Sequence, residues 1–131
     1  MADRVEAILE GMVGELDELS RLQLFSASEV RALVSRRRDF EYKLHRRKPV
    51  RSDFLRAIQY ELSFDSLRRH RKDKIAPDVK GVSDFATVRR IFFLFQRALR
   101  KFPNDIALWN QYLNYAIRIK SSRALNQAFA R

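Results

Sequence analysis

The sequence lacks cysteine altogether and has only three glycines and three prolines among its 131 residues. Without cysteine, this chain has no disulfide, no thiolate nucleophile and no cysteine-ligated zinc or iron–sulfur site. Sheets and tight hairpins depend on glycine and proline turns, so the scarcity of both favours long helices joined by short connections. The three glycines are also too dispersed to form a phosphate-binding loop. The composition therefore predicts an all-α protein and removes several common kinds of active site.

Long apolar runs and a leader sequence are missing as well. The longest apolar run, from Ile91 to Phe95, is far shorter than the roughly 20 residues that cross a bilayer. The first residues are acidic and amphipathic, and they lack the charged-then-apolar pattern of a signal peptide. We therefore expect a soluble intracellular chain without membrane contact.

Patterns of catalytic and metal-binding residues are equally scarce. Neither His45 nor His70 has further metal ligands at helical spacing, and both lie among basic residues. No nucleophile elbow holds a serine, and the acidic residues Glu6, Glu10 and Asp17 are expected to form a solvated helix face. The sequence thus predicts no catalytic residue, no metal, no cofactor and no small-molecule substrate.

Charge is abundant but unevenly placed. The chain carries a net charge of +11, yet residues 1–30 hold two basic and seven acidic side chains, so the other 101 residues carry +16. A basic body behind an acidic first helix predicts an anionic partner, either RNA or an acidic protein tail. The alternative interpretation is that the basic side chains form ordinary solvated helix faces.

The basic residues gather in short clusters, which are the best candidates for contacts with RNA or an acidic partner. Those in the middle of the second expected helix are exposed on most helical registers, and the run 68–74 resembles a nuclear localisation patch. The candidate contact residues are Arg36, Arg37, Arg38, Arg46, Arg47, Lys48, Arg51, Arg68, Arg69, Arg71 and Lys72.

Apolar residues at three- and four-residue steps predict a series of amphipathic helices. Ser26 and Glu29 have the spacing of a capping box, Ser52 or Asp53 can cap the next helix, and prolines interrupt the pattern afterwards. The expected helices cover residues 2–19, 27–47, 52–67, 84–102 and 105–120, and another begins after Ser121 or Ser122. In domain terms, we expect N-terminal helices over 1–74, a linker over 75–83, and a second unit over 84–131 that ends partway through a solenoid.

An internal echo at an offset of 55 residues is the clearest sign of architecture. It aligns Phe95 with Phe40, Leu99 with Leu44, and Trp109 with Phe54. Repeated helical units stack and bury their apolar faces against one another, and such chains usually act as binding scaffolds. Aromatic residues can also stack on RNA bases, but their helical spacing favours a structural role. The expected core of the repeat is Phe54, Phe95, Leu99, Pro103, Trp109 and Tyr112.

The second copy of the echo resembles the half-a-TPR (HAT) repeat. The segment Arg97-Ala98-Leu99, then Pro103, then Trp109 and Tyr112 follows the order of that repeat's motif. In the first copy, Phe54 replaces the tryptophan and Ala57 the tyrosine, so this copy is degenerate, as expected of a terminal cap. The resemblance implies an α-solenoid of stacked antiparallel helix pairs.

A longer block is more specific than the repeat motif. It runs through Leu24-Phe25-Ser26, the segments 29–34 and 40–44, and Gln59-Tyr60-Glu61. This block resembles the N-terminal region of the family of the sixth U-three small nucleolar RNA-associated protein, and the likeness covers essentially the whole chain. It implies a nucleolar HAT-repeat scaffold of the UtpB complex in the small-subunit processome, supporting maturation of 18S rRNA.

The resemblance also implies partners and leaves alternatives. The expected partners are WD-repeat propeller subunits of the UtpB complex and the particle that contains U-three small nucleolar RNA and pre-rRNA. We therefore expect a non-catalytic scaffold in the nucleus and nucleolus. Two alternatives stay open: a helical module that binds RNA directly, and a HAT-repeat scaffold of another RNA-processing complex.

Overall fold

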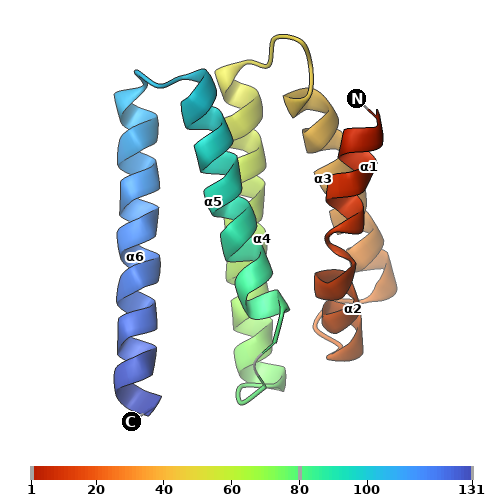
Figure 1. Cartoon of the computed structure of the whole chain (residues 1–131). Coiled ribbons are helices and arrows are strands. Elements are labelled where there is room, and N and C mark those ends of the chain that lie inside the picture. The colour runs from red at the N-terminus through yellow and green to blue at the C-terminus, as the bar shows by residue number, and fades with distance from the viewer. Residues whose placement is uncertain (1, 80, 131) are drawn as a thin grey trace. The chain divides into compact units, whose positions relative to one another are not determined.

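The structure consists of helices and their connections throughout the residues that it describes (Figure 1). It is a computed structural model that describes residues 2–79 and 81–130, and the side chains of 3–79 and 81–120. The helices are α1 (Ala2–Glu10), α2 (Val13–Arg21), α3 (Ala27–Leu44), α4 (Arg51–Ile75), α5 (Ser83–Lys101) and α6 (Ile106–Ala130). The all-α prediction is confirmed for these residues.

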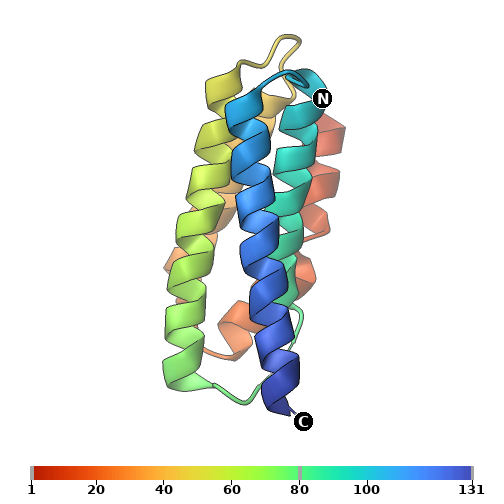
Figure 2. The same cartoon turned by 90° about the vertical axis from the view of Figure 1, so that its left-hand side faces the viewer.

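The chain forms two compact units, residues 1–94 and residues 95–131, so the boundary falls within α5. In the first unit, α1 and α2 pack on α3, and α3 packs on α4. The segment that joins α4 to α5 lies at the opposite end of α4 from the α3–α4 turn (Figure 2). The second unit contains the last turns of α5, a short turn and α6.

The first expected helix is divided in two. The amide of Gly11 bonds to Ala7, but the amide of Met12 donates to Leu9 O at 3.0 Å, a tighter bond that ends the α-helical ladder. Two nearby glycines weaken the helix here because glycine loses more backbone entropy than other residues. The prediction of one helix over 2–19 is therefore wrong, and α2 continues to Arg21.

Helix α3 begins as its capping box predicts. Ser26 N donates to Glu29 Oε1 at 2.9 Å, and Glu29 N donates to Ser26 Oγ at 3.2 Å. These bonds satisfy two amides that the first helical turn leaves free. The helix ends at Leu44, three residues before the expected end.

Helix α4 is longer than its apolar pattern predicts. It begins at Arg51, where Asp53 Oδ2 accepts from Val50 N at 3.1 Å, and it continues through the basic run 68–74 to Ile75. The apolar period stops at Leu67 because the buried face continues with charged residues, Arg68 and Lys72. The segment between α4 and α5 covers only residues 76–82.

The apolar core of the first unit lies where the turn after α2 meets α3 and α4. It contains Leu19, Leu24, Phe25, Leu33 and Phe64. The rings of Phe25 and Phe64 lie 5.1 Å apart. Gln23 has a φ of 59°, a left-handed conformation that lets this turn close tightly.

The second unit has its own packing. The ring of Phe95 lies 5.5 Å from that of Tyr112 and 6.1 Å from that of Tyr115. Phe95, Leu99 and Leu108 are buried. Helix α6 continues to Ala130, so the expected break near Ser121 is wrong, while the side chains of 121–130 lie outside the described residues.

The 55-residue offset holds for the starts of two helices, since α4 begins at residue 51 and α6 begins at residue 106. The starts of α3 and α5, at residues 27 and 83, differ by 56 positions. Of the expected repeat core, Phe54, Phe95 and Leu99 are buried.

The expectation of burial is wrong for Trp109 and Pro103, and Tyr112 is only half-buried. The side chain of Trp109 is 41% exposed, and its Nε1 donates to Pro103 O at 2.8 Å. Tryptophan at this position therefore fastens the α5–α6 turn in place of filling a core.

Candidate functional site

The most unusual feature of the first unit is a network of buried charges between four helices. Arg37 of α3 is fully buried, and its Nε and Nη2 donate to the two carboxylate oxygens of Glu61 in α4, at 2.7 and 3.0 Å. Its Nη1 donates to Glu15 in α2. Burial alone lowers the pKa of Arg37, but the carboxylates of Glu61 and Glu15 outweigh it and raise the pKa above its usual value.

A second arginine completes the network. Arg90 of α5 donates from Nε to Glu61 Oε1 at 2.8 Å and from Nη2 to Glu41 Oε1 at 3.1 Å. Thr87 Oγ1 donates to Glu15 Oε2 at 3.1 Å. The two guanidinium groups thus pair with three carboxylates where water is excluded, and these contacts connect α2, α3, α4 and α5.

Another buried cluster joins the last turns of α4 to the start of α5. Arg68 donates to Asp65 Oδ1 at 2.9 Å and to Asp84 Oδ1 at 3.2 Å. Lys72 Nζ lies 3.1 Å from Asp84 Oδ1. Glu18 of α2 accepts from Ser83 Oγ at 2.9 Å. The beginning of α5 is therefore held mainly by charged and polar contacts.

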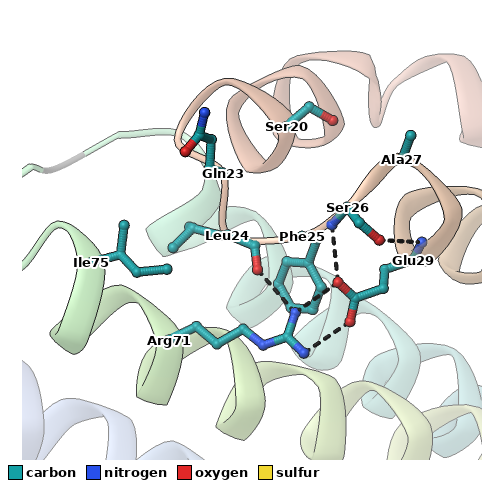
Figure 3. A pocket seen from close by; sticks show the side chains of 9 residues that line it. All are labelled: Ser20, Gln23, Leu24, Phe25, Ser26, Ala27, Glu29, Arg71 and Ile75. Atoms are coloured by element: carbon teal, nitrogen blue, oxygen red, sulfur yellow. Dashed lines mark hydrogen bonds and ion pairs between the residues drawn. The ribbon is translucent and has the colours of Figure 1, made fainter.

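Arg71 forms a third arrangement, beside a hollow of about 720 Å³ at the α2–α3 turn (Figure 3). Its Nη1 donates to Leu24 O at 3.0 Å, and its Nη2 lies 2.8 Å from Glu29 Oε2. The guanidinium also lies 4.6 Å from the centre of the Phe25 ring, within cation–π range. The bond from Arg71 and that from the Ser26 amide lower the pKa of Glu29 to about 2.

These contacts correct the list of candidate basic residues. Arg37, Arg68 and Lys72 are buried in ion pairs, so the prediction that they contact RNA or an acidic partner is wrong for them. The run 68–74 is helical and partly buried, which is unsuited to recognition as an extended localisation signal. Salt bridges with carboxylates also engage Arg38, Arg69 and Arg71.

The remaining candidate basic residues are exposed to solvent. Arg36 is exposed, and its guanidinium lies about 6 Å from the rings of Phe40 and Tyr60. Arg46, Arg47 and Lys48 are exposed in the turn between α3 and α4, and Arg51 is exposed at the first residue of α4. The structure therefore separates the basic residues that hold helices together from those that face solvent, which are Arg36 in the middle of α3 and Arg46, Arg47, Lys48 and Arg51 around the α3–α4 turn.

The acidic partners of the buried network were not predicted. Glu15, Glu41, Glu61 and Asp65 are all buried, whereas Glu6, Glu10 and Asp17 are exposed, as expected. One signal was present in the sequence: Glu15 lies three residues after Met12 and four before Leu19, within the apolar stripe. Arg37 lies four residues after Leu33 and seven before Leu44, so it is also on an apolar stripe. A charge on an apolar stripe indicates a buried ion pair.

Neither a metal centre nor a membrane span emerges from the part of the chain that the structure describes. There, no group of three histidine or acidic residues is placed to hold a metal ion. None of the described helices is both long and apolar enough to cross a bilayer. The buried carboxylates are satisfied by arginine, lysine and hydroxyl donors, so their arrangement is that of a structural network.

Comparison with known proteins gives a consistent result. Residues 9–90 match the family described as U3 small nucleolar RNA-associated protein 6. The chain is 40% identical over 123 residues to the protein of that name from Schizosaccharomyces pombe, covering 92% of this chain and 25% of the relative. It is 30% identical over 131 residues to the homologues from Mus musculus and Homo sapiens, covering 99% of this chain and 22% of each relative.

The chain thus spans about a quarter of the length of these relatives. The family match includes α2, α3 and α4 entirely, and with them Glu15, Arg37 and Glu61 of the buried network. Both the extent of the match and the identity with relatives over nearly the whole chain lead to one conclusion. The chain belongs to the U3 small nucleolar RNA-associated protein 6 family.

Proposed function

We propose that this chain is part of a non-catalytic scaffold in the nucleolar small-subunit processome, where it supports maturation of 18S rRNA. One observation carries the proposal: the family match over residues 9–90, together with identity of 30–40% to proteins named for association with U3 small nucleolar RNA. Nucleus and nucleolus are the compartments that this function requires.

The proposed architecture is a HAT-type α-solenoid. The 55-residue displacement between the starts of α4 and α6 supports it, as does the Trp109 and Tyr112 motif in the second copy. In this arrangement, residues 1–74 form the degenerate first part, 75–83 a linker and 84–131 the second repeat. Stacked repeats of this kind offer long surfaces for partner proteins.

Exposed apolar residues on α6 support protein contact as the mode of action. Ile106, Leu113 and Ile117 are 75%, 49% and 64% exposed, and they recur at seven- and four-residue steps along one face. Trp109 lies on the same face. A row of large apolar side chains in water is typical of a surface that a neighbouring repeat or another protein covers. The partners that we propose are WD-repeat propeller subunits of the UtpB complex.

Affinity purification of the tagged full-length protein from a cell extract tests this function. We expect propeller subunits and U3 RNA to co-purify with it, and both should persist at moderate salt. Recovery of splicing or polyadenylation factors instead would assign the chain to another RNA-processing complex. Recovery of neither set would refute the scaffold function.

Direct RNA binding is the second candidate function. The observation that favours it is the exposed basic turn between α3 and α4, which retains Arg46, Arg47 and Lys48 after the buried ion pairs are set aside. Such a contact would add to the protein scaffold and would not replace it.

A further inference from the structure

The turn between α3 and α4 has an unusual balance of charge. Residues 45–50 connect the two helices and project beyond their ends (Figure 1). Arg46, Arg47 and Lys48 stand in succession there, all exposed. The nearest acidic residues along the chain are Glu41 and Asp53, both buried, and the exposed Asp39. Three adjacent cations therefore face solvent at one site.

A hollow lies beside this turn on the last turns of α3. It has a volume of about 390 Å³ and is lined by Asp39, Tyr42, Lys43 and Arg46. Tyr42 is half-buried and forms one side of the hollow. The site thus combines an aromatic ring, two cations and one carboxylate, and the further cations of the turn follow directly along the chain.

We propose that the hollow and the turn together bind single-stranded RNA. A base stacks on the ring of Tyr42, while Lys43, Arg46, Arg47 and Lys48 neutralise the phosphates of the adjoining backbone. Aromatic rings beside cationic grooves are the usual means by which proteins hold single strands without reading their sequence.

Tyr42 and Asp39 favour RNA over an acidic protein segment. The Asp39 carboxylate repels phosphates as it repels acidic side chains, but it can accept a hydrogen bond from the exocyclic amine of adenine, cytosine or guanine, which an acidic side chain does not offer. An acidic peptide would also gain little from the Tyr42 ring. The preference for RNA rests in part on the proposed function, because a pre-ribosomal particle exposes single-stranded RNA.

Fluorescence anisotropy of the purified protein with a short labelled oligoadenylate measures this binding. The test variant replaces Arg46, Arg47 and Lys48 with glutamine, and the control replaces Arg21, Arg31 and Lys74, which are exposed elsewhere. Both lose three charges. We expect the test variant to bind about ten- to a hundredfold more weakly, with a log–log salt slope reduced by about 2. The control should bind within about threefold of the wild type.

Two further variants test the ring. Tyr42→Ala should weaken binding at least about fivefold, whereas Tyr42→Phe should retain it, because stacking needs the ring and not the hydroxyl. Thermal unfolding of both variants shows whether the fold is retained. Equal weakening by the two triple variants, or unchanged binding by Tyr42→Ala at an intact fold, would overturn the proposal.

A polyglutamate peptide and an RNA duplex serve as competing probes. The proposal is supported if unlabelled single-stranded RNA displaces the labelled oligoadenylate more effectively than polyglutamate and the RNA duplex do. Tighter binding of polyglutamate than of single-stranded RNA contradicts it. The outcome is separable from that of the scaffold function. Absence of RNA binding by the wild-type protein with propeller co-purification intact refutes only this site, and RNA binding without propeller co-purification refutes only the scaffold.

Discussion

Arg37 and Glu61, 24 residues apart in the chain, face each other across α3 and α4 with two parallel hydrogen bonds of 2.7 and 3.0 Å. Both side chains are about 1% exposed. A paired geometry of this kind fixes the rotation of each helix, because neither charge can turn away without losing its partner in a site that excludes water. The pair therefore sets which faces of α3 and α4 meet.

Replacing Arg37 should be costly. Arg37→Met leaves the carboxylates of Glu15 and Glu61 with fewer donors in a buried site, so the free energy of unfolding should fall by about 3–5 kcal/mol. Urea denaturation followed by circular dichroism measures the change. Arg38→Met is the matched control: its partner Glu6 is 48% exposed, and such surface pairs contribute about 0–1 kcal/mol. Similar costs for both variants would show that burial does not raise the cost of removing one partner of the pair.

The α4–α5 connection should tolerate no side chain at Gly81. A Cβ there would overlap the carboxylate of Glu18, which Ser83 holds through both its amide and its hydroxyl. Gly81→Ala should therefore lower the free energy of unfolding by about 1–3 kcal/mol.

Gly14→Ala serves as the control for that substitution. A Cβ at Gly14 would lie 4.0 Å from Val82 Cγ1, an ordinary contact. Alanine in the first turn of α2 should then raise stability by up to about 1 kcal/mol, because it has less backbone freedom to lose. Thermal unfolding of the two variants should move in opposite directions, and a common direction would contradict the geometry.

Glu29 should titrate far below an ordinary glutamate. The hydrogen bond from Arg71 and the one from the Ser26 amide hold its pKa at about 2, compared with an ordinary value of 4.5. A lowered pKa means that the carboxylate stabilises the fold fully above about pH 4.5, and that this contribution is lost as the pH falls toward 2.

NMR titration of the Glu29 carboxyl measures this pKa directly. In Arg71→Gln it should rise toward 4.5, and the acid loss of stability assigned to Glu29 should shrink. Lys74→Gln, which removes an exposed charge one helical turn further along α4, should leave it unchanged. If the pKa of Glu29 stays the same in both variants, Arg71 is not the cause of its low value.

The apolar face of α6 should matter for assembly more than for the folding of residues 1–131 alone. Ile106→Glu with Ile117→Glu places two charges on side chains that are 75% and 64% exposed, so the stability of this 131-residue chain should change by less than about 1 kcal/mol. Co-purification of propeller subunits should fall severalfold. The control, Gln111→Glu with Asn114→Glu, adds the same charge at exposed polar positions of α6 and should leave it unchanged. Equal recovery with both variants would exclude this face as the contact surface.

Apolar periodicity and capping residues predict most of the helices, because helix formation and capping depend on residues that are close together in the sequence. Ser26 and Glu29 mark the start of α3 correctly, since both bonds of the capping box lie within one helical turn. The end of α4 was missed because its buried stripe continues through Arg68 and Lys72, which an apolar pattern cannot register. The division of α1 from α2 was missed because glycine weakens a helix without fixing where it breaks.

The candidate contact residues show even more clearly what local sequence patterns cannot predict. Eleven basic side chains were equivalent in sequence, since each is a lysine or arginine in a charged segment. Several of them have roles that depend on carboxylates 12 to 42 positions away, as with Lys72 and Asp84 or Arg71 and Glu29. Arg37 and Arg38 adjoin in sequence, yet one is buried and the other lies near the surface.

The sequence by itself determined that this chain is helical, free of cysteine, strongly basic and similar to one family, because composition, local spacing and a specific block of residues carry that information. Only the tertiary structure decided which charges are available to a partner. Burial raises the cost of an unpaired charge, so folding brings each interior arginine to a distant carboxylate. Arg46, Arg47 and Lys48 stay in solvent because they occupy a turn, where no helix face packs against them.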